Sequence, residues 1–262
     1  MTDSVRRRLR RRHLLHRWTP VSSGASGDRV WHLSGRGGLY VKIGADPAAL
    51  RAEAERAEWL RSQGVAAPEP VESGEDDGTG WLVSRAVPGR PVSGEWPAHL
   101  RAPVVAAFAR LARRLHDLPA AECPFERGLD HTVPQARERV RRNLVEAGDF
   151  DAERAGTAPE QALAELERTA PSEPGPDRVV CHGDLTPDNA LVDPATLEWT
   201  GVVDTGRLGR ADRHLDLAVA LRDLDGAPAW GPNFARAFAH HYGDHLIDPD
   251  RLAFYRLLDE FF

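Results

Sequence analysis

Residues 179–204 read VVCHGDLTPDNALVDPATLEWTGVVD, and this stretch decides how the rest of the chain is interpreted. It opens with two β-branched valines, which predict a short buried strand, and Gly183 ends that strand in a turn that carries Asp184. Asn189 follows five residues later, and the remainder predicts a hairpin that returns the chain to Asp204 beside Asn189.

Two carboxylates and an amide around one loop are suited to magnesium-dependent phosphoryl transfer. Asn and Asp offer the hard oxygens that Mg²⁺ prefers, and an Asp without a metal can accept the proton of an attacking hydroxyl. By position we assign Asp184 as the base, and Asn189 and Asp204 as metal ligands. The alternative is that all of these residues only form turns, since Asp, Asn and Gly are common in loops.

The motifs HGDLTPDN and VVDTGRLGRADRHLDLA resemble those of the aminoglycoside 3'-phosphotransferases, a branch of the protein-kinase-like superfamily. In this resemblance Asp184 lies where protein kinases have the HRD loop, and Asp204 where they have DFG. The resemblance extends to the final FYRLLDEFF, so we expect a complete chain. It implies an α+β, protein-kinase-like two-lobed fold, with a small antiparallel-sheet N-lobe carrying one packed helix and a larger, mainly helical C-lobe.

The composition indicates an ordinary globular protein. Its 262 residues, 41% hydrophobic and 28% charged, suffice for one large domain or two small lobes. No apolar run approaches the ~20 residues of a membrane span and the N-terminus lacks a secretory signal, so we expect a cytoplasmic protein without a membrane partner. The net charge of −6 argues against a general nucleic-acid binder and is compatible with a cationic small molecule. Cys123 and Cys181 provide no disulfide framework and are expected to be buried.

Lys42 is the only lysine among 34 basic residues, which singles it out. The alternation in LYVKI places Tyr40 and Lys42 on one face of a strand, where a lysine can reach the α- and β-phosphates of a nucleotide. A lone lysine on a strand is otherwise usually solvated. Residues 47–63 predict a helix that begins at a proline and ends before Gly64. By spacing alone, its candidate partners for Lys42 are Glu53, Glu55 and Glu58.

The resemblance completes a nucleotide site for ATP and Mg²⁺. It selects Glu53, six residues before Trp59, and it implies that Tyr40 stacks on adenine. It also implies main-chain contacts to the adenine edge from a hinge at residues 84–89, which divides the expected lobes into residues 1–87 and 88–262. A small polar loop, residues 22–28, would position the phosphates. The implied nucleotide-binding residues are Ser26, Tyr40, Lys42, Glu53, Val83 at the back of the pocket, Ser84 and Ala86.

Acidic segments are candidates for contacting the substrate. Residues 134–169 predict one or two helices interrupted by GDFDAE, whose carboxylates are either solvated or await a cation. In the resemblance this insertion receives amino groups of the substrate, and the free carboxylate of Phe262 adds to a negative C-terminus that favours an amine-rich ligand. The implied substrate-binding residues are Asp149, Asp151, Glu153, Arg207, Arg222, Asp223, Asp259, Glu260 and Phe262.

The remaining patterns predict scaffold elements. Residues 4–18 predict a basic helix with a solvated arginine face and with Leu9, Leu14, Leu15 and Trp18 available for packing. Two strands are expected at residues 68–71 and 80–83, around an acidic turn at 73–78. Further helices are expected at 103–117, where His116 is a cap or packing residue, at 211–224, where Asp216 holds the catalytic loop from behind, and at 249–262.

Three functions are compatible with this sequence. The first is ATP-dependent phosphorylation of the 3'-hydroxyl of kanamycin- or neomycin-type aminoglycosides, which confers resistance, by a monomer or weak dimer. The second keeps the fold but takes another hydroxyl or amine compound, such as choline, a macrolide or a peptide antibiotic, and the LDEFF ending argues against it. The third is a catalytically silent kinase-like protein, which need not retain Lys42, Asp184, Asn189 and Asp204 together.

Overall fold

The chain forms two compact units in the computed structural model, which describes residues 2–21, 27–35, 38–171, 178–226 and 230–262. The first unit comprises Met1–Gly89 and Thr200–Gly206, and the second comprises Arg90–Trp199 and Arg207–Phe262. The segment with Asp204 therefore belongs to the N-terminal unit although it is distant from it in sequence. The predicted division into residues 1–87 and 88–262 did not include the return of residues 200–206 to the first unit.

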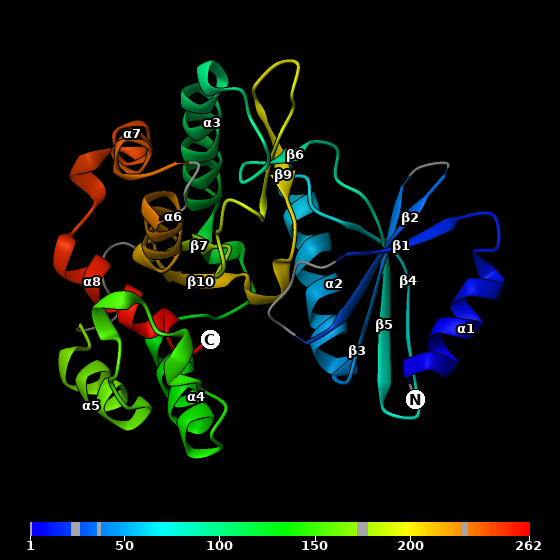
Figure 1. The fold of residues 1–262 in the computed structure, drawn as a ribbon, viewed down its shortest axis with the longest axis horizontal. Coiled ribbons are helices and arrows are strands. Elements are labelled where there is room, and N and C mark those ends of the chain that lie inside the picture. The colour runs from blue at the N-terminus through cyan, green and yellow to red at the C-terminus, as the bar shows by residue number, and fades with distance from the viewer. Residues whose placement is uncertain (1, 22–26, 36–37, 172–177, 227–229) are drawn as a thin grey trace. The chain divides into compact units, whose positions relative to one another are not determined.

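A five-stranded antiparallel sheet is the framework of the first unit (Figure 1), with strand order β1-β2-β3-β5-β4. In chain order, the elements of the first unit up to the end of this sheet are α1 (Thr2–Arg12), β1 (Arg17–Val21), β2 (Arg29–Ser34), β3 (Leu39–Gly44), α2 (Pro47–Ser62), β4 (Glu69–Asp76) and β5 (Thr79–Arg85). The predicted acidic turn at 73–78 is wrong, because β4 continues to Asp76. Only Asp77 and Gly78 form the turn, with φ of 48° and 70°, as in a two-residue hairpin loop.

The two faces of this sheet carry different helices. Side chains alternate along β3, so Val41 and Ile43 join a buried cluster with Val5 and Leu9 of α1, while Lys42 faces the other way. Helix α2 covers the face of Lys42, and its N-terminus is capped by the side chain of Asp46, which accepts the N–H of Ala49. The predicted single packed helix is α2, and α1 adds a second one.

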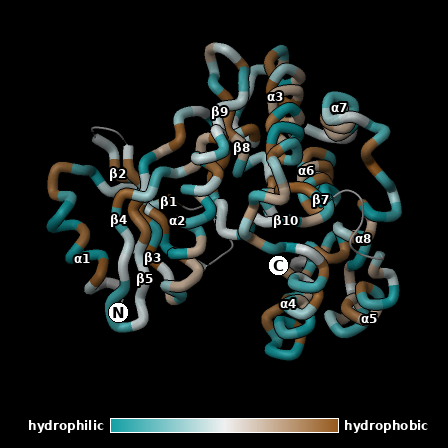
Figure 2. Tube along the Cα trace, turned by 180° about the vertical axis from the view of Figure 1, so that it is seen from behind, coloured by the Kyte–Doolittle hydropathy of each residue, from teal (hydrophilic) through white to brown (hydrophobic). Residues whose placement is uncertain are grey.

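Helix α1 is shorter than predicted and ends at Arg12, so Trp18 belongs to β1. Leu14 and Leu15 lie beyond the helix with 76% and 97% of their surface exposed, so the prediction that they pack is wrong. Although α1 is largely hydrophilic (Figure 2), part of its arginine face is not simply solvated. The guanidinium groups of Arg6, Arg8 and Arg10 lie 5.9, 4.5 and 5.6 Å from the ring centres of Trp31, Trp81 and Trp18.

We expect α1 to stabilise the first unit through Leu9. Leu9 is fully buried, so Leu9→Ala should lower the free energy of unfolding by about 2–5 kcal/mol through the lost contacts and the cavity left behind. Leu15→Ala is the matched control, because this side chain is almost fully exposed and its loss should change stability by less than about 0.5 kcal/mol. Urea unfolding measures both, and equal effects of the two substitutions would contradict the packing of α1.

The second unit is mainly helical, as predicted, and its helices surround short strands. Its elements are β6 (Arg90–Pro91), α3 (Ala98–His116), α4 (Leu129–Arg141), α5 (Pro159–Thr169), β7 (Arg178–Cys181), β8 (Ala190–Val192), β10 (Gly209–Asp212), α6 (His214–Gly226), α7 (Pro232–Tyr242) and α8 (Pro249–Asp259). Its 3₁₀ turns are η1 (Ala120–Glu122), η2 (Ala147–Asp149), η3 (Ala152–Arg154) and η5 (Asp244–Leu246). Most residues of β9 (Trp199–Val202) and of the 3₁₀ turn η4 (Thr205–Arg207) belong to the first unit.

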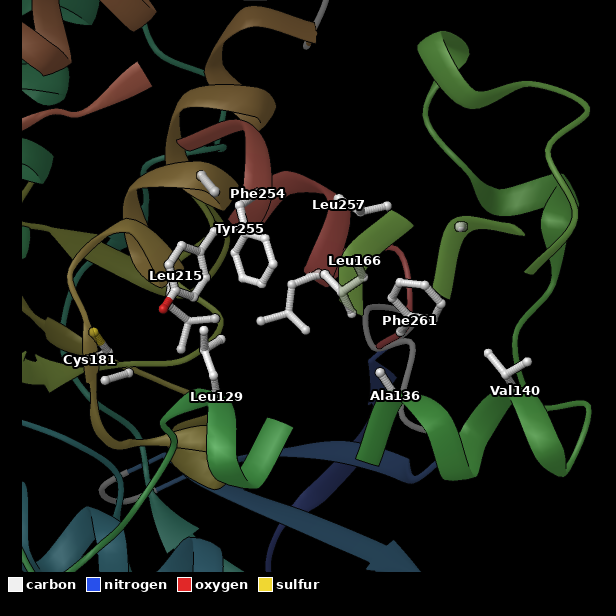
Figure 3. Packing of buried hydrophobic residues seen from close by; sticks show 14 of the residues in the cluster. Leu129, Ala136, Val140, Leu166, Cys181, Leu215, Phe254, Tyr255, Leu257 and Phe261 are labelled. Atoms are coloured by element: carbon white, nitrogen blue, oxygen red, sulfur yellow. The ribbon is translucent and has the colours of Figure 1, made fainter. Parts of the chain in front are cut away.

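The core of the second unit lies between α4, α5, α6 and α8 (Figure 3). Leu166, Leu257 and Phe261 are almost completely buried there, and Cys181 closes one side of the same cluster. Both Cys181 and Cys123 are buried free cysteines, as predicted. Within the part of the chain that the structure describes, no helix has both the length and the apolar character needed to cross a membrane.

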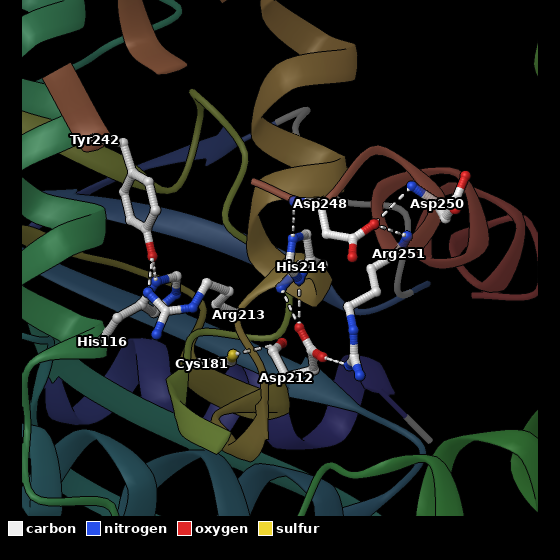
Figure 4. Close-up of polar contacts among 9 residues, drawn as sticks. All are labelled: His116, Cys181, Asp212, Arg213, His214, Tyr242, Asp248, Asp250 and Arg251. Atoms are coloured by element: carbon white, nitrogen blue, oxygen red, sulfur yellow. Dashed lines mark hydrogen bonds and ion pairs between the residues drawn. The ribbon is translucent and has the colours of Figure 1, made fainter. Parts of the chain in front are cut away.

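Helix α6 starts later than predicted because the residues before it form a strand. Asp212 pairs with Arg178 in the antiparallel ladder of β10 and β7, and it is not part of the helix. Its carboxylate lies 2.6 Å from His214 Nδ1 and forms an ion pair with Arg251 of α8 (Figure 4). In contrast, helix α3 begins earlier than the sequence predicted, at Ala98. Helix α8 ends earlier than predicted, at Asp259.

Candidate active site

The predicted site residues divide between the two units: Lys42, Glu53 and Asp204 belong to the first, and Asp184 and Asn189 to the second. In the first unit, Lys42 Nζ lies 3.0 and 2.8 Å from the two carboxylate oxygens of Glu53, and 3.2 Å from Asp204 Oδ1. Of the three glutamates that spacing left open, Glu53 is the one in contact with Lys42. The other two, Glu55 and Glu58, are exposed.

The two carboxylates keep Lys42 charged. Burial by itself would lower the pKa of Lys42, but the negative charges of Glu53 and Asp204 and their hydrogen bonds outweigh it, and the pKa is raised above its ordinary value. The side chains of Lys42 and Glu53 are largely buried, whereas Asp204 remains 44% exposed. A fixed positive charge that cannot be lost at neutral pH is suited to holding the phosphates of a nucleotide.

Asp204 has an unusual backbone conformation. Its φ of 58° lies in the left-handed region, which few residues other than glycine adopt, and such positions concentrate at functional sites. The next residue fixes the turn, because Thr205 Oγ1 donates to the main-chain oxygen of Glu53 at 3.2 Å. Glu53 of α2 therefore contacts both residues: its carboxylate binds Lys42, and its main-chain oxygen binds Thr205 next to Asp204.

Two of the predicted adenine contacts have surroundings that the resemblance did not indicate. Val83 lies opposite Val41 and belongs to the cluster under α1, so its side chain is on the face away from Lys42, and Leu82 is the residue opposite Lys42. The N–H of Ala86 donates to the carbonyl of Gly38 at 2.9 Å, so this donor is already used. A resemblance gives positions along a strand but neither its register nor its other hydrogen bonds, and the contacts of Val83 and Ala86 with a nucleotide stay predictions.

Other predicted nucleotide contacts lie on the face of Lys42. Tyr40 is 37% exposed, and its ring centre is 5.0 Å from that of His32 on β2. Ser84 lies directly opposite Tyr40 in β5. Tyr40 thus has an accessible ring, which an adenine requires for stacking. Ser26 is outside the described residues.

In the second unit, β7 ends in the loop that carries Asp184. Gly183 has φ of 83°, and a Cβ at this position would collide with the carbonyl oxygen of Arg207, so glycine is required. The buried carboxylate of Asp216 accepts the N–H groups of His182 and Gly183, both at 2.8 Å. Asp216 thus holds this loop from behind, in the position that the sequence predicted.

Asn189 lies against Asp184. Its Nδ2 donates to the main-chain oxygen of Asp184 at 2.9 Å and to Asp184 Oδ2 at 3.1 Å. Because the amide nitrogen faces Asp184, the amide oxygen points to the other side and can serve as a hard ligand for Mg²⁺. Arg207 Nη1 lies 3.8 Å from Asp184 Oδ1, which places a positive charge beside the proposed base.

The predicted acidic cluster is partly neutralised. Arg222 forms ion pairs with Asp223 and Asp259, so the net charge of this group is smaller than the sequence suggested. Glu260 instead accepts the main-chain N–H of Asp151 at 3.1 Å. Burial raises the pKa of Glu260 to about 6, with the nearby charge of Asp151 acting in the same direction.

The members of the 148–153 insertion differ in their surroundings. Asp151 is half-buried beside Glu260, and Glu153 is exposed within η3. Of Asp149 only the backbone is described, in η2. The structure thus links one of the three predicted acids of this insertion, Asp151, to the cluster at α8.

Phe262 lies beside the predicted site residue Arg207 and beside two further arginines that sequence reasoning missed. Arg207 Nη2 donates to the main-chain oxygen of Phe262 at 3.0 Å. The guanidinium groups of Arg127, Arg139 and Arg207 lie 5.0, 6.0 and 5.8 Å from the centre of its ring. No local pattern marks Arg127 or Arg139 in the sequence, because both become neighbours of Phe262 only through the packing of distant segments.

Residues 17–255 match APH, the phosphotransferase enzyme family. The chain belongs to this family. An aminoglycoside 3'-phosphotransferase of Streptomyces fradiae is 49% identical to this chain over an alignment of 275 positions, which covers 100% of both chains. The crystal structure of aminoglycoside-3'-phosphotransferase of type VIII superposes with a TM-score of 0.92 at 48% identity, and covers 100% of this chain and 99% of that one.

A further structure in this phosphotransferase family contains ligands. Aminoglycoside phosphotransferase APH(3'')-Id from Streptomyces rimosus, in complex with ADP and streptomycin, is 32% identical with a TM-score of 0.77, and covers 93% of this chain and 92% of that one. The resemblance drawn from the HGD and VVD motifs is therefore confirmed, as is the α+β, protein-kinase-like fold. The chain is a phosphotransferase enzyme.

Proposed function

We propose that this enzyme transfers the γ-phosphoryl group of ATP to the 3'-hydroxyl of kanamycin- and neomycin-type aminoglycosides, and so confers resistance to them. The observation that carries the proposal is the loop of Asp184, which is fixed by Asp216 and in contact with Asn189. The full-length similarity to aminoglycoside 3'-phosphotransferases supports the substrate class, and the ADP in the S. rimosus structure supports a nucleotide donor.

Each residue has a role that its surroundings support. Lys42, held by Glu53, binds the phosphates of ATP, and Asp184 orients the sugar hydroxyl and accepts its proton. The hard oxygens of Asn189 and Asp204 suit Mg²⁺, which when bound would draw negative charge from the phosphates. The reaction needs no covalent intermediate on the enzyme, because the hydroxyl attacks the phosphorus directly.

The acidic residues of the second unit would bind the amino groups of the drug. Glu260 and Asp151 are joined by a hydrogen bond, and Asp223 and Asp259 lie on either side of Arg222. An ammonium group that enters this cluster exchanges water for carboxylates that are already ordered, which lowers the entropic cost of binding. We place the reaction in the cytoplasm, where ATP is available, and expect a monomer or weak dimer.

A panel of aminoglycosides tests the proposal. Transfer of ³²P from ATP should occur to kanamycin and should fail with the 3'-deoxy analogue of kanamycin, since that analogue lacks the attacked oxygen. Transfer to the 3'-deoxy analogue would contradict the regiochemistry. Transfer to streptomycin alone would assign the enzyme to the activity suggested by the ligand of the S. rimosus relative.

We expect the affinity for the drug to depend on Glu260 and pH. The pKa of Glu260 is raised to about 6, so its carboxylate is charged above this pH and neutral below it. An ammonium group binds the charged form, so the KM for kanamycin should rise about five- to tenfold between pH 7 and pH 5. In Glu260→Gln this rise should be smaller and the KM at pH 7 already high. An unchanged pH profile in Glu260→Gln would exclude this contact.

A further inference from the structure

A buried row of polar side chains connects α7 and α3 to the loop that carries Asp184. Arg213 Nη1 donates to the hydroxyl oxygen of Tyr242 at 3.0 Å, and this oxygen lies 2.7 Å from His116 Nδ1 (Figure 4). His116 Nε2 lies 3.1 Å from Asp216 Oδ2. Asp216 is the carboxylate that holds the main chain of the catalytic loop, so the row ends at that loop.

The chemistry of the groups fixes the direction of each hydrogen bond. A guanidinium can only donate and a carboxylate can only accept, so Tyr242 accepts from Arg213 and His116 Nε2–H donates to Asp216. In the tautomer with its N–H at Nε2, His116 accepts at Nδ1 and the Tyr242 hydroxyl donates to it. Each hydrogen bond in the row therefore pairs one donor with one acceptor, and the imidazole is held in one tautomer.

The row is shielded from water. The side chains of His116 and Asp216 are 1% and 0% exposed, and Tyr242 is also buried. Burial raises the pKa of Tyr242 to about 12, which keeps its hydroxyl protonated as a donor. Asp216 lies in the first turn of α6, where the partial positive charge of the helix N-terminus stabilises a carboxylate. In such surroundings each lost hydrogen bond leaves a buried polar group without its partner.

The same place has the geometry of a metal site, but its chemistry favours a hydrogen-bond network. His116, Cys181 and Asp216 offer ligand atoms within 4.8 Å of one another. Burial, followed by the charges of Asp216 and Asp212, raises the pKa of Cys181 well above its usual value, and metals bind the thiolate rather than the thiol. Cys181 Sγ instead donates to the main-chain oxygen of Asp212 at 3.3 Å. Asp216 already accepts three N–H groups.

We propose that Tyr242 and His116 are positioning residues for phosphoryl transfer: they orient the carboxylate of Asp216 and, through it, the loop that presents Asp184. This inference rests on the proposed function for its kinetic consequences. The carboxylate of Asp216 has two oxygens for three donors, so the donor at Nε2 of His116 decides how the carboxylate is turned towards His182 and Gly183. Tyr242 acts one step earlier, by fixing the imidazole.

Tyr242→Phe tests the row with the smallest change. It removes one hydroxyl and keeps the ring, which is stacked on Phe238. We expect kcat to fall about tenfold, the loss that one buried hydrogen bond can produce, with the KM values for ATP and kanamycin unchanged within about twofold. Tyr255→Phe is the matched control, because Tyr255 is a buried tyrosine of the same unit that packs in the α8 core cluster. Its kcat should be that of the unsubstituted enzyme.

A pair of substitutions at His116 separates positioning from packing. Glutamine can place an N–H donor close to the position of Nε2, whereas leucine fills similar space without a donor. We therefore expect His116→Gln to retain kcat within about threefold and His116→Leu to lose more than about tenfold. Equal losses in the two variants, measured on folded protein with similar melting temperatures, would overturn the role of the Nε2 donor.

Amide NMR tests the row without relying on catalysis. The ¹H shifts of the His182 and Gly183 amides report their hydrogen bonds to Asp216, and Tyr242→Phe should move both while Tyr255→Phe should not. Unchanged amide shifts together with an unchanged kcat in Tyr242→Phe would refute the inference. If the unsubstituted enzyme phosphorylates no aminoglycoside, the proposed function fails, and the amide shifts still decide whether the row orients the loop.

Discussion

Asp184→Asn is expected to lower kcat for kanamycin phosphorylation by about 10²–10⁴-fold, the range of general acid–base catalysis. The amide has the shape of the carboxylate, and its oxygen can still accept the bond that Asn189 Nδ2 makes at 3.1 Å. The loop should therefore keep its conformation and lose only the group that accepts the hydroxyl proton. The KM values for ATP and kanamycin should change by less than about threefold.

Asp188→Asn is the matched control for Asp184→Asn. Asp188 lies four residues further along the same loop, is exposed and accepts a hydrogen bond from Ser93, which an asparagine oxygen can also accept. Its kcat should remain unchanged. If Asp184→Asn retained more than about a tenth of the activity, another group would have to accept the proton and the assignment of Asp184 would be wrong.

Asp204→Asn is expected to lower kcat by about 10²–10³-fold and to raise the Mg²⁺ concentration required for half-maximal activity at least about tenfold. Asparagine keeps a hard oxygen but not the negative charge, and it tolerates the φ of 58° at this position better than alanine does. Steady-state rates over a Mg²⁺ titration measure both effects. A lower kcat with an unchanged Mg²⁺ dependence would contradict the role of Asp204 as a metal ligand.

Asp77→Asn provides the control for charge in the same unit. Asp77 also has a positive φ, of 48°, and lies at the tip of the β4–β5 hairpin. It loses the same charge in a similar backbone conformation, and neither kcat nor the Mg²⁺ dependence should change. Asp204→Asn also removes one of the two carboxylates in contact with Lys42, so nucleotide binding should be measured separately, by titration with ATP without Mg²⁺.

Residues whose role depends on local chain geometry were predicted well. The turn with Gly183 and Asp184 follows directly from a strand that ends in glycine, and Lys42 and Tyr40 share a face because strand side chains alternate. Asp216 was also placed correctly behind the loop. The statements about the turn and about β3 needed only the order of residues along one or two neighbouring elements, whereas Asp216 contacts a loop 33 residues before it.

Residues whose role depends on register or on distant packing were predicted poorly. Val83 lies on the other face of the sheet, because its direction depends on pairing with Val41. Two arginines beside Phe262 were missed, because Arg127 precedes α4 and Arg139 lies in its last turn, and charge neutralisation by Arg222 depends on α6 packing against α8. Such contacts join segments that no spacing rule connects.

The sequence by itself determined which side chains can perform phosphoryl transfer and which strand–turn patterns hold them, because turn chemistry and side-chain alternation act over a few residues. Spacing left Glu53, Glu55 and Glu58 open as partners of Lys42 and the resemblance selected Glu53, but only the tertiary structure showed the contact itself and decided that Tyr242 and His116 support Asp216. How the helices pack in three dimensions decides which residues become partners. A buried hydrogen bond or ion pair between distant residues is specific, and its loss costs free energy because a buried polar group is then left without its partner.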